Sequence, residues 1–200
     1  MSSGQSAILS DRDVVKKIMD GDRHAATLLV RRTEKLVAQI VFKMLGNHPD
    51  RKDLTQDIYL KTFRYLPRFR FQCKLSTWVA QISYTTCLDH LQKYRLELIT
   101  ISTGDELSLG NTCSQEISGD IPDASQLLSI KERSEILEKL STTLPPVYRT
   151  LITLFHKEEL SVEEIRDITG LPVGTVKNYL FRARKVLKES LLNHYSKEDL

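Results

Sequence analysis

Residues 160–187 read LSVEEIRDITGLPVGTVKNYLFRARKVL, and their spacing predicts two helices joined by a tight turn. Ser161 and Glu164 have the spacing of a capping box, in which each side chain bonds the backbone N–H of the other residue. A short helix should therefore begin at this point and end near Gly170, which suits a left-handed turn. Pro172 is well placed for the first turn of the next helix. The stretch predicts a helix-turn-helix.

The second of these helices has an apolar stripe and a basic outer face. Val176, Leu180, Ala183, Leu187 and Leu191 recur at helical spacing and are expected to be buried. Between residues 171 and 188 there are five bases and no acid. In a recognition helix, early residues contact base edges and later cations contact phosphates. A charged outer face can also serve only to keep a helix soluble, but the capped helix and turn that precede it favour DNA binding.

The rest of the chain also predicts helices. Apolar pairs recur at one helical face between residues 28 and 45, and the segment 47–49 then breaks the pattern. Further helices are expected over 53–66, ended by Pro67, and over 76–95. Between residues 97 and 127 the composition shifts to Ser, Thr, Gly, Asp and Asn, which is typical of a linker. The expected fold is all-α, with two small helical domains, 1–97 and 128–200, joined by a flexible linker, 98–127.

Charge is unevenly distributed along the 200 residues. Residues 1–95 carry a net charge of +8, residues 96–130 carry −6, and residues 131–200 carry +1. Such segregation indicates a polyanionic partner for the two ends of the chain. The acidic middle suits a segment that mimics a nucleic-acid strand, although a simple tether explains it equally well.

Aromatic and basic side chains are concentrated in one stretch, residues 59–78. It holds six of the fourteen aromatic residues of the chain and five bases, with no acid. Tyr59, Phe63 and Leu66 have helical spacing and should be core residues, and Trp78, after a cap at Ser76 or Thr77, should also be packed. Phe69 and Phe71 instead follow a proline and alternate with arginines, so at least one of them should be exposed. Aromatic faces beside cations are what binding of an unpaired strand requires.

These motifs resemble those of bacterial sigma factors of the extracytoplasmic-function group. The segment 160–187 is similar to the family's C-terminal DNA-binding domain in the patterns "LS..EI", "G.P.GTV" and "RAR..L", with departures at Arg166, Asn178 and Tyr179. In the first half, GDRHAATLLVRR (21–32) resembles the family's first helix, and DLTQDIYLKTFRYL (53–66) resembles its "DLxQExF" segment. Response regulators share parts of the helix-turn-helix pattern, so the first half is what decides between the families.

The resemblance implies a subunit that binds core RNA polymerase, directs it to promoter DNA and helps to open it, with an anti-sigma factor as a further partner. It implies a polymerase-binding surface at Asp53, Gln56 and Asp57. The residues it implies for minus-10 recognition and melting are Arg64, Arg68, Phe69, Arg70, Phe71, Gln72, Lys74 and Thr85. The residues it implies for minus-35 recognition are Thr175, Lys177, Asn178, Phe181, Arg182 and Lys185. Thr85 stands where the family commonly has asparagine, so the minus-10 base preference stays open.

Other functional classes find little support. The three cysteines lack metal-ligand spacing, and Cys87 with His90 is too small a ligand set, so neither a disulfide framework nor a metal site is expected. No catalytic constellation or phosphate-binding loop is present, so we expect no enzyme and no cofactor. Without an apolar run or a signal peptide the protein should be cytoplasmic, with no membrane insertion. Two alternatives stay open: a helix-turn-helix regulator that acts without polymerase, and a DNA-processing enzyme such as a recombinase.

Overall fold

The computed structural model describes residues 9–101 and 130–194, and all regular structure in these two ranges is helical. The helices, in chain order, are α1 (Asp11–Met19), α2 (Arg23–Leu45), α3 (Arg51–Tyr65), the 3-10 turn η1 (Leu66–Arg68), α4 (Leu75–Ile101), α5 (Ile130–Ser141), α6 (Pro146–His156), α7 (Val162–Thr169) and α8 (Val173–His194). The expected all-α fold is confirmed for these residues. Among them, no helix is both long and apolar enough to span a bilayer.

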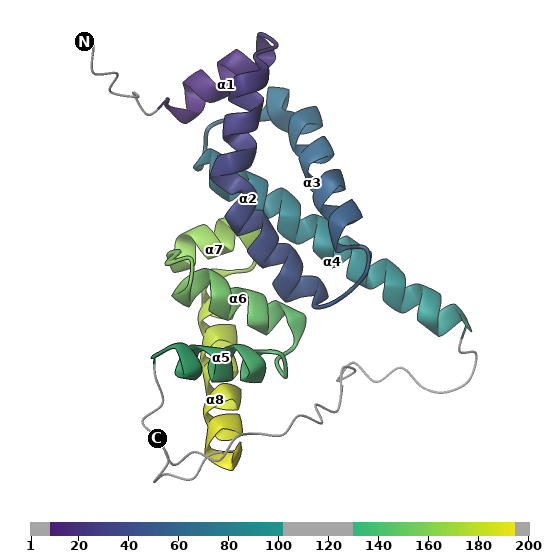
Figure 1. The fold of residues 1–200 in the computed structure, drawn as a ribbon, viewed down its shortest axis with the longest axis vertical. Helices are drawn as coiled ribbons and strands as arrows, with labels where there is room; N and C mark the ends of the chain where they lie inside the picture. The colour runs from purple at the N-terminus through teal and green to yellow at the C-terminus, as the bar shows by residue number, and fades with distance from the viewer. Residues whose placement is uncertain (1–8, 102–129, 195–200) are drawn as a thin grey trace.

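The first helical group, α1–α4, is built around α2. Helices α1, α3 and α4 each contact α2, and α3 also contacts α4 (Figure 1). The apolar pairs expected between residues 28 and 45 form one buried face of α2, with Leu29, Val37 and Ile40 almost fully enclosed. Asp22 caps this helix by accepting the backbone N–H groups of His24 and Ala25.

Helix α4 is longer than its expected span of 76–95, because it continues to Ile101. The residues after Arg95 include no glycine or proline before Gly104, so nothing in the local sequence ends the helix earlier. The expected linker, 98–127, therefore begins inside α4. The remainder of that linker lies outside the described residues.

The second helical group, α5–α8, contains the predicted helix-turn-helix. Ser161 accepts the backbone N–H of Glu164, whose carboxylate accepts the N–H of Ser161, so the capping box is present as expected. Gly170 ends α7 with a φ of 72°, the left-handed conformation that glycine adopts without steric cost. Helix α8 then begins at Val173, directly after Pro172.

The two helical groups pack directly against each other, which no pattern in the sequence indicates. Helix α6 lies against α2 and α7 lies against α4 (Figure 1). Buried side chains of both groups belong to one continuous hydrophobic cluster. Three ion pairs also cross between the groups, each joining a lysine of the first group to a glutamate of the second: Lys35–Glu158, Lys43–Glu138 and Lys74–Glu164.

Candidate nucleic-acid interface

The aromatic loop, residues 66–74, joins α3 to α4. Pro67 has no backbone N–H and lies in η1, so the α-helical hydrogen bonds of α3 end before it. The N–H of Phe69 donates to the Leu66 carbonyl at 3.0 Å and closes the 3-10 turn. Phe71 then adopts a φ of 57°, a left-handed conformation that bulky residues seldom occupy. Such strain persists only where neighbouring contacts maintain it.

A column of aromatic rings supplies those contacts. The Phe69 ring lies 5.0 Å from Trp78 and 4.7 Å from Phe71, measured between ring centroids. The Arg12 guanidinium of α1 covers the Phe71 ring at 5.4 Å. Phe69 is only 8% exposed and Phe71 is 37% exposed, so the column runs from the core to the surface. The expectation that at least one loop ring is exposed therefore holds, and Trp78 is packed as expected.

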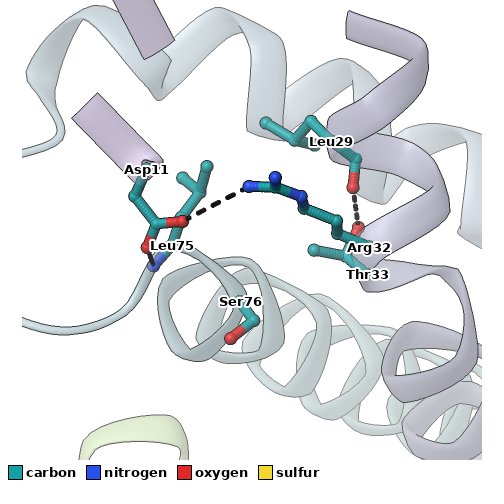
Figure 2. Close-up of a pocket in the computed structure, with 6 residues that line it drawn as sticks. All are labelled: Asp11, Leu29, Arg32, Thr33, Leu75 and Ser76. Atoms are coloured by element: carbon teal, nitrogen blue, oxygen red, sulfur yellow. Dashed lines mark hydrogen bonds and ion pairs between the residues drawn. The ribbon is translucent and has the colours of Figure 1, made fainter. Parts of the chain in front are cut away.

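The end of the loop is fastened by a carboxylate that sequence analysis did not identify. Asp11 of α1 accepts the backbone N–H of Leu75, the first residue of α4, at 2.8 Å, and its other oxygen lies 3.9 Å from an Arg32 nitrogen. Figure 2 shows Asp11 between these two groups. A small cavity of about 150 Å³ lies here, lined by Asp11, Leu29, Arg32, Thr33, Leu75 and Ser76.

The sequence predicts a cap for α4 at Ser76 or Thr77, but the group that bonds the start of α4 is Asp11 of α1. Thr77 is buried and lies inside the first turn of α4. The expected position was wrong because the carboxylate that bonds the start of the helix comes from a residue far away in the sequence.

Exposed cations surround the loop. Arg64, Arg68 and Arg70 are exposed, and so is Gln72. Lys74 is also exposed, but its ammonium group donates to Glu164 of α7 at 2.8 Å. This hydrogen bond is the main reason that the pKa of Lys74 is raised and that the pKa of Glu164 is lowered. One cation of the loop is therefore neutralised by the second helical group.

Thr85 does not lie in the aromatic loop. It is exposed on α4, about 15 Å along the helix from Leu75 at 1.5 Å per residue. Its hydroxyl donates to the Gln81 carbonyl at 2.9 Å, within its own helix. The structure thus brings the loop residues together and places Thr85 at a separate point of α4.

Helix α8 separates its buried and outward residues as expected. Val176, Leu180 and Ala183 are buried, and Leu187 and Leu191 are half-buried. Five of the six predicted minus-35 residues are exposed, and Thr175 is half-buried; the exposed ones are Lys177, Asn178, Phe181, Arg182 and Lys185. Phe181 is 66% exposed, which is unusual for a phenyl ring without a partner. This face of α8 offers hydrogen-bonding, cationic and apolar groups together.

The third predicted surface lies on α3. Asp53, Gln56 and Asp57 are all exposed and share one face of the helix, because residues three and four apart are neighbours on a helix. Leu60 extends the same face and is 65% exposed. The sequence does not single out Leu60, because helical spacing does not distinguish an apolar residue that lacks a partner from one in the core. We call these four residues the acidic face of α3.

Comparison with known proteins identifies both halves of the chain. The model of Sigma-70 region 2 matches residues 29–97, and the model of Sigma-70, region 4 matches residues 134–187. The region 2 match includes the aromatic loop and the acidic face of α3. The region 4 match includes α7 and the outward residues of α8.

Curated relatives match over nearly the whole chain. The sigma-E factor of Escherichia coli (strain K12), an extracytoplasmic-function (ECF) RNA polymerase sigma factor, is 31% identical over 179 residues, which cover 90% of this chain and 93% of the relative. The ECF sigma factor SigW of Bacillus subtilis (strain 168) is 29% identical over 181 residues, covering 88% and 94%.

Two solved structures share the fold at 21% sequence identity. The first is CnrH in complex with the cytosolic domain of CnrY, with a TM-score of 0.60 and coverage of 93% of this chain and 99% of that one. The second is the sigma factor RpoE of Bartonella quintana in complex with the anti-sigma factor NepR, with a TM-score of 0.59 and coverage of 88% and 97%. These structures show the fold, and the sequence matches show that the chain belongs to the extracytoplasmic-function group of RNA polymerase sigma factors.

Proposed function

We propose that this chain binds core RNA polymerase, directs it to promoters and opens the minus-10 element. The observation that carries the proposal is the exposed Phe71 ring, which is held in a strained loop among exposed cations. A protein that reads only duplex DNA has no need of such a ring. Membership of the sigma family supplies the polymerase as the partner, and its relatives are initiation factors, so we propose no catalysis by the chain itself.

Opening of the minus-10 element is assigned to the aromatic loop. Stacking of one base on an aromatic ring contributes about 1–3 kcal/mol, and extrusion of a base costs a few kcal/mol. Phe71 supplies a ring that is 37% exposed beside the Arg12 guanidinium, and Arg64, Arg68 and Arg70 would neutralise phosphates. Phe69 is buried, so its part is to support the Phe71 ring from below. Gln72, Lys74 and Thr85 complete the proposed minus-10 surface.

Recognition of the minus-35 element is assigned to α8. Its early outward residues, Thr175, Lys177 and Asn178, would approach base edges in the major groove. Phe181 and Arg182 follow one turn later. Lys185 lies further along, where phosphate contact is expected. The two domains of the family, 1–97 and 128–200 in this chain, would thereby bind the two promoter elements.

Polymerase binding is assigned to the acidic face of α3. An exposed leucine among polar side chains has the composition of a small interface centre, because apolar anchors surrounded by polar groups carry most of the affinity in protein complexes. Leu60 would be that anchor, and Asp53, Gln56 and Asp57 would select a basic partner surface. Since this partner acts on the chromosome, we propose that the chain works in the cytoplasm.

A second protein partner follows from the two structural neighbours. Both were solved as complexes, one with an anti-sigma factor and one with the cytosolic domain of CnrY. We therefore propose that an anti-sigma factor binds this chain as well.

The decisive experiment is transcription with purified core polymerase and genomic promoter fragments, with and without this chain. We expect specific start sites only when the chain is present, and weak binding of duplex DNA by the chain alone in gel-shift assays. Tight, sequence-specific binding without polymerase, together with no new start sites, would instead identify a helix-turn-helix regulator.

A further inference from the structure

Two neighbouring residues, a histidine and an aspartate, meet a histidine that is distant in the sequence at the turn between α2 and α3. His48 lies in that turn, Asp50 directly precedes α3, and His90 comes from α4. One possible ligand atom of each residue lies within 4.8 Å of those of the other two. An oxygen of Asp50, Oδ2, is 3.7 Å from His48 Nδ1 and 3.6 Å from His90 Nε2. The carboxylate therefore lies between two imidazoles.

Asp50 does not use its carboxylate in the usual way for its position. An aspartate at the N-cap of a helix commonly accepts a backbone N–H of the first turn. Asp50 occupies the N-cap of α3, but its side chain makes no capping hydrogen bond, and its φ of −73° and ψ of 3° are not those of an extended cap. The carboxylate is instead directed at His48 and His90.

His90 contributes an unsatisfied nitrogen to the same point. Its Nε2 atom is buried and has no hydrogen-bond partner. Buried polar atoms are nearly always paired, so an unpaired one calls for a missing partner. His48 Nδ1 accepts only one long hydrogen bond, of 3.3 Å, from the Asp50 N–H, and an ion bound at Nδ1 would replace it.

The imidazole rings are held in place by their neighbours. The His48 ring packs edge to face against His90, with centroids 5.3 Å apart, and against Tyr94 at 5.2 Å. The turn itself is fixed by Arg51, whose Nε donates to the His48 carbonyl at 3.2 Å. The cluster is thus built from a fixed turn and one helix.

We propose that His48, Asp50 and His90 bind one divalent transition-metal ion, for which Zn²⁺ is the probe. Two imidazole nitrogens and one carboxylate oxygen are ligands for Zn²⁺ and similar ions, whereas Ca²⁺ and Mg²⁺ prefer oxygen ligands throughout. Ligands about 2.0–2.1 Å from a tetrahedral zinc ion lie about 3.3 Å from one another. The observed 3.6 and 3.7 Å to Asp50 are close to that separation. The exposed side of Asp50 leaves a fourth position for water.

This set differs from the pair that sequence analysis considered and rejected. Cys87 is fully buried, and burial raises the pKa of its thiol to about 12, so it does not supply a thiolate beside His90. The ligands come instead from the turn between α2 and α3 and from α4. An ion bound by them would join the start of α3, and with it the acidic face of α3, to α4.

Zinc titration of the full-length, metal-stripped chain, monitored with a competing chromophoric chelator, tests the proposal. We expect one site, with affinity reduced at least about tenfold by each of His48→Gln, Asp50→Asn and His90→Gln, since loss of even an outer partner of a ligand costs that much. His24→Gln is the matched control, because His24 is exposed at the start of α2. Excess Zn²⁺ should raise the Tm of the wild type and the control only, and Mg²⁺ should raise neither.

A measurement on the wild-type chain alone removes any dependence on how well the variants fold. In nitrogen-15 imidazole spectra, stoichiometric Zn²⁺ should shift two of the five histidines of the chain. Binding that is equal in all four variants, or shifts spread over every histidine, would show adventitious binding and overturn the site. Failure to bind Zn²⁺ would overturn it as well, and neither result bears on polymerase binding.

Discussion

Phe69 and Phe71 are only two residues apart, yet their rings have different surroundings. Phe69 is enclosed between Trp78 and Phe71. Phe71 is partly exposed, with the guanidinium of Arg12 over its ring. Truncation of an enclosed phenylalanine removes packing, while truncation of an exposed one removes mainly a surface for stacking. The two rings are therefore separable by experiment.

We expect Phe71→Ala to reduce initiation on duplex promoters by about 5- to 150-fold, the equivalent of about 1–3 kcal/mol of stacking. Initiation on a template with a pre-opened bubble should change much less, because no base must be extruded there. Transcription assays on the two templates measure the difference. Phe71→Tyr, which keeps a ring, should restore activity.

Phe69→Ala should instead lower the free energy of unfolding by about 3 kcal/mol, because its ring is buried. Urea unfolding followed by circular dichroism measures this loss. A variant with unchanged stability and a defect confined to duplex templates would show that Phe69 contacts DNA directly.

Two helices, α8 and α3, each carry a face to which we have assigned a proposed function. The outward residues of α8 extend over more than two turns, from Lys177 to Lys185. On α3, the acidic face is distinguished by Leu60, which no other described side chain covers well. Each face can be tested by substituting its residues and measuring binding to promoter DNA or to core polymerase.

On α8, Asn178→Ala should change the preferred base at one or two minus-35 positions, because an asparagine amide can bond both N6 and N7 of adenine. Lys185→Ala should weaken binding about equally for all sequences and reduce the salt slope by about one. Selection from a randomised minus-35 library with each variant, bound to polymerase, measures both effects. Changed sequence preference for Lys185→Ala alone would overturn the proposed docking.

On α3, Leu60→Ser should weaken binding to core polymerase by at least about tenfold, the equivalent of about 1.4 kcal/mol. Stability should change by less than about 0.5 kcal/mol, because the side chain is already exposed. Met19→Ser, at an exposed apolar residue of α1, is the matched control. Equal affinity of the two variants for core polymerase would remove Leu60 from the interface.

For the whole molecule, the direct packing of the two helical groups has an electrostatic component. Lysines of the first group meet glutamates of the second, and Lys74, a proposed phosphate contact, is one of them. DNA and Glu164 would therefore compete for the same ammonium group. This competition is one physical reason for the free chain to bind DNA weakly.

We expect Glu164→Gln to increase single-strand binding by the isolated chain, measured by fluorescence anisotropy. Glutamine can keep the capping box of α7 through its one amide oxygen, and it removes both the charge and the acceptor for Lys74. Glu163→Gln, at an exposed neighbour without a described ion pair, is the control. If both variants bind a strand equally, net charge rather than the Lys74 contact is responsible.

The pair between Lys74 and Glu164 also predicts a pH dependence. The pKa of Glu164 is lowered, so the stabilisation is complete above its ordinary value of 4.5 and is lost as the pH falls through the lower folded-state pKa. The pKa of Lys74 is raised above 10.5, so the pair is also lost only at more alkaline pH. Relative to Glu164→Gln, the wild type should thus lose stability in acid, and again above pH 10.5 as Lys74 loses its proton, as urea unfolding at several pH values would show.

Local rules made most of the helices predictable. A capping box spans four residues and a glycine turn depends on one, so Ser161, Glu164 and Gly170 could be interpreted from short spacings alone. The unpredicted side-chain contacts join distant residues: Asp11 with Leu75, Lys74 with Glu164, and His48 with His90. Spacing also does not determine which of two alternating rings turns inward, as with Phe69 and Phe71, because that depends on where Trp78 is packed.

The hydrogen bond that Asp11 accepts from the first residue of α4 ties α1 to the aromatic loop. All the predicted DNA contacts lie after residue 63, so a shortened chain beginning at α2 would keep each of them. It would nevertheless lose the anchor of the loop at Leu75 and the cover over Phe71 in one step. The loop would then have to be ordered when DNA binds, and the lost conformational entropy would oppose promoter opening. In the intact chain the loop is already ordered by folding. Helix α1 thus fixes the conformation of a loop that lies more than forty residues further along the chain.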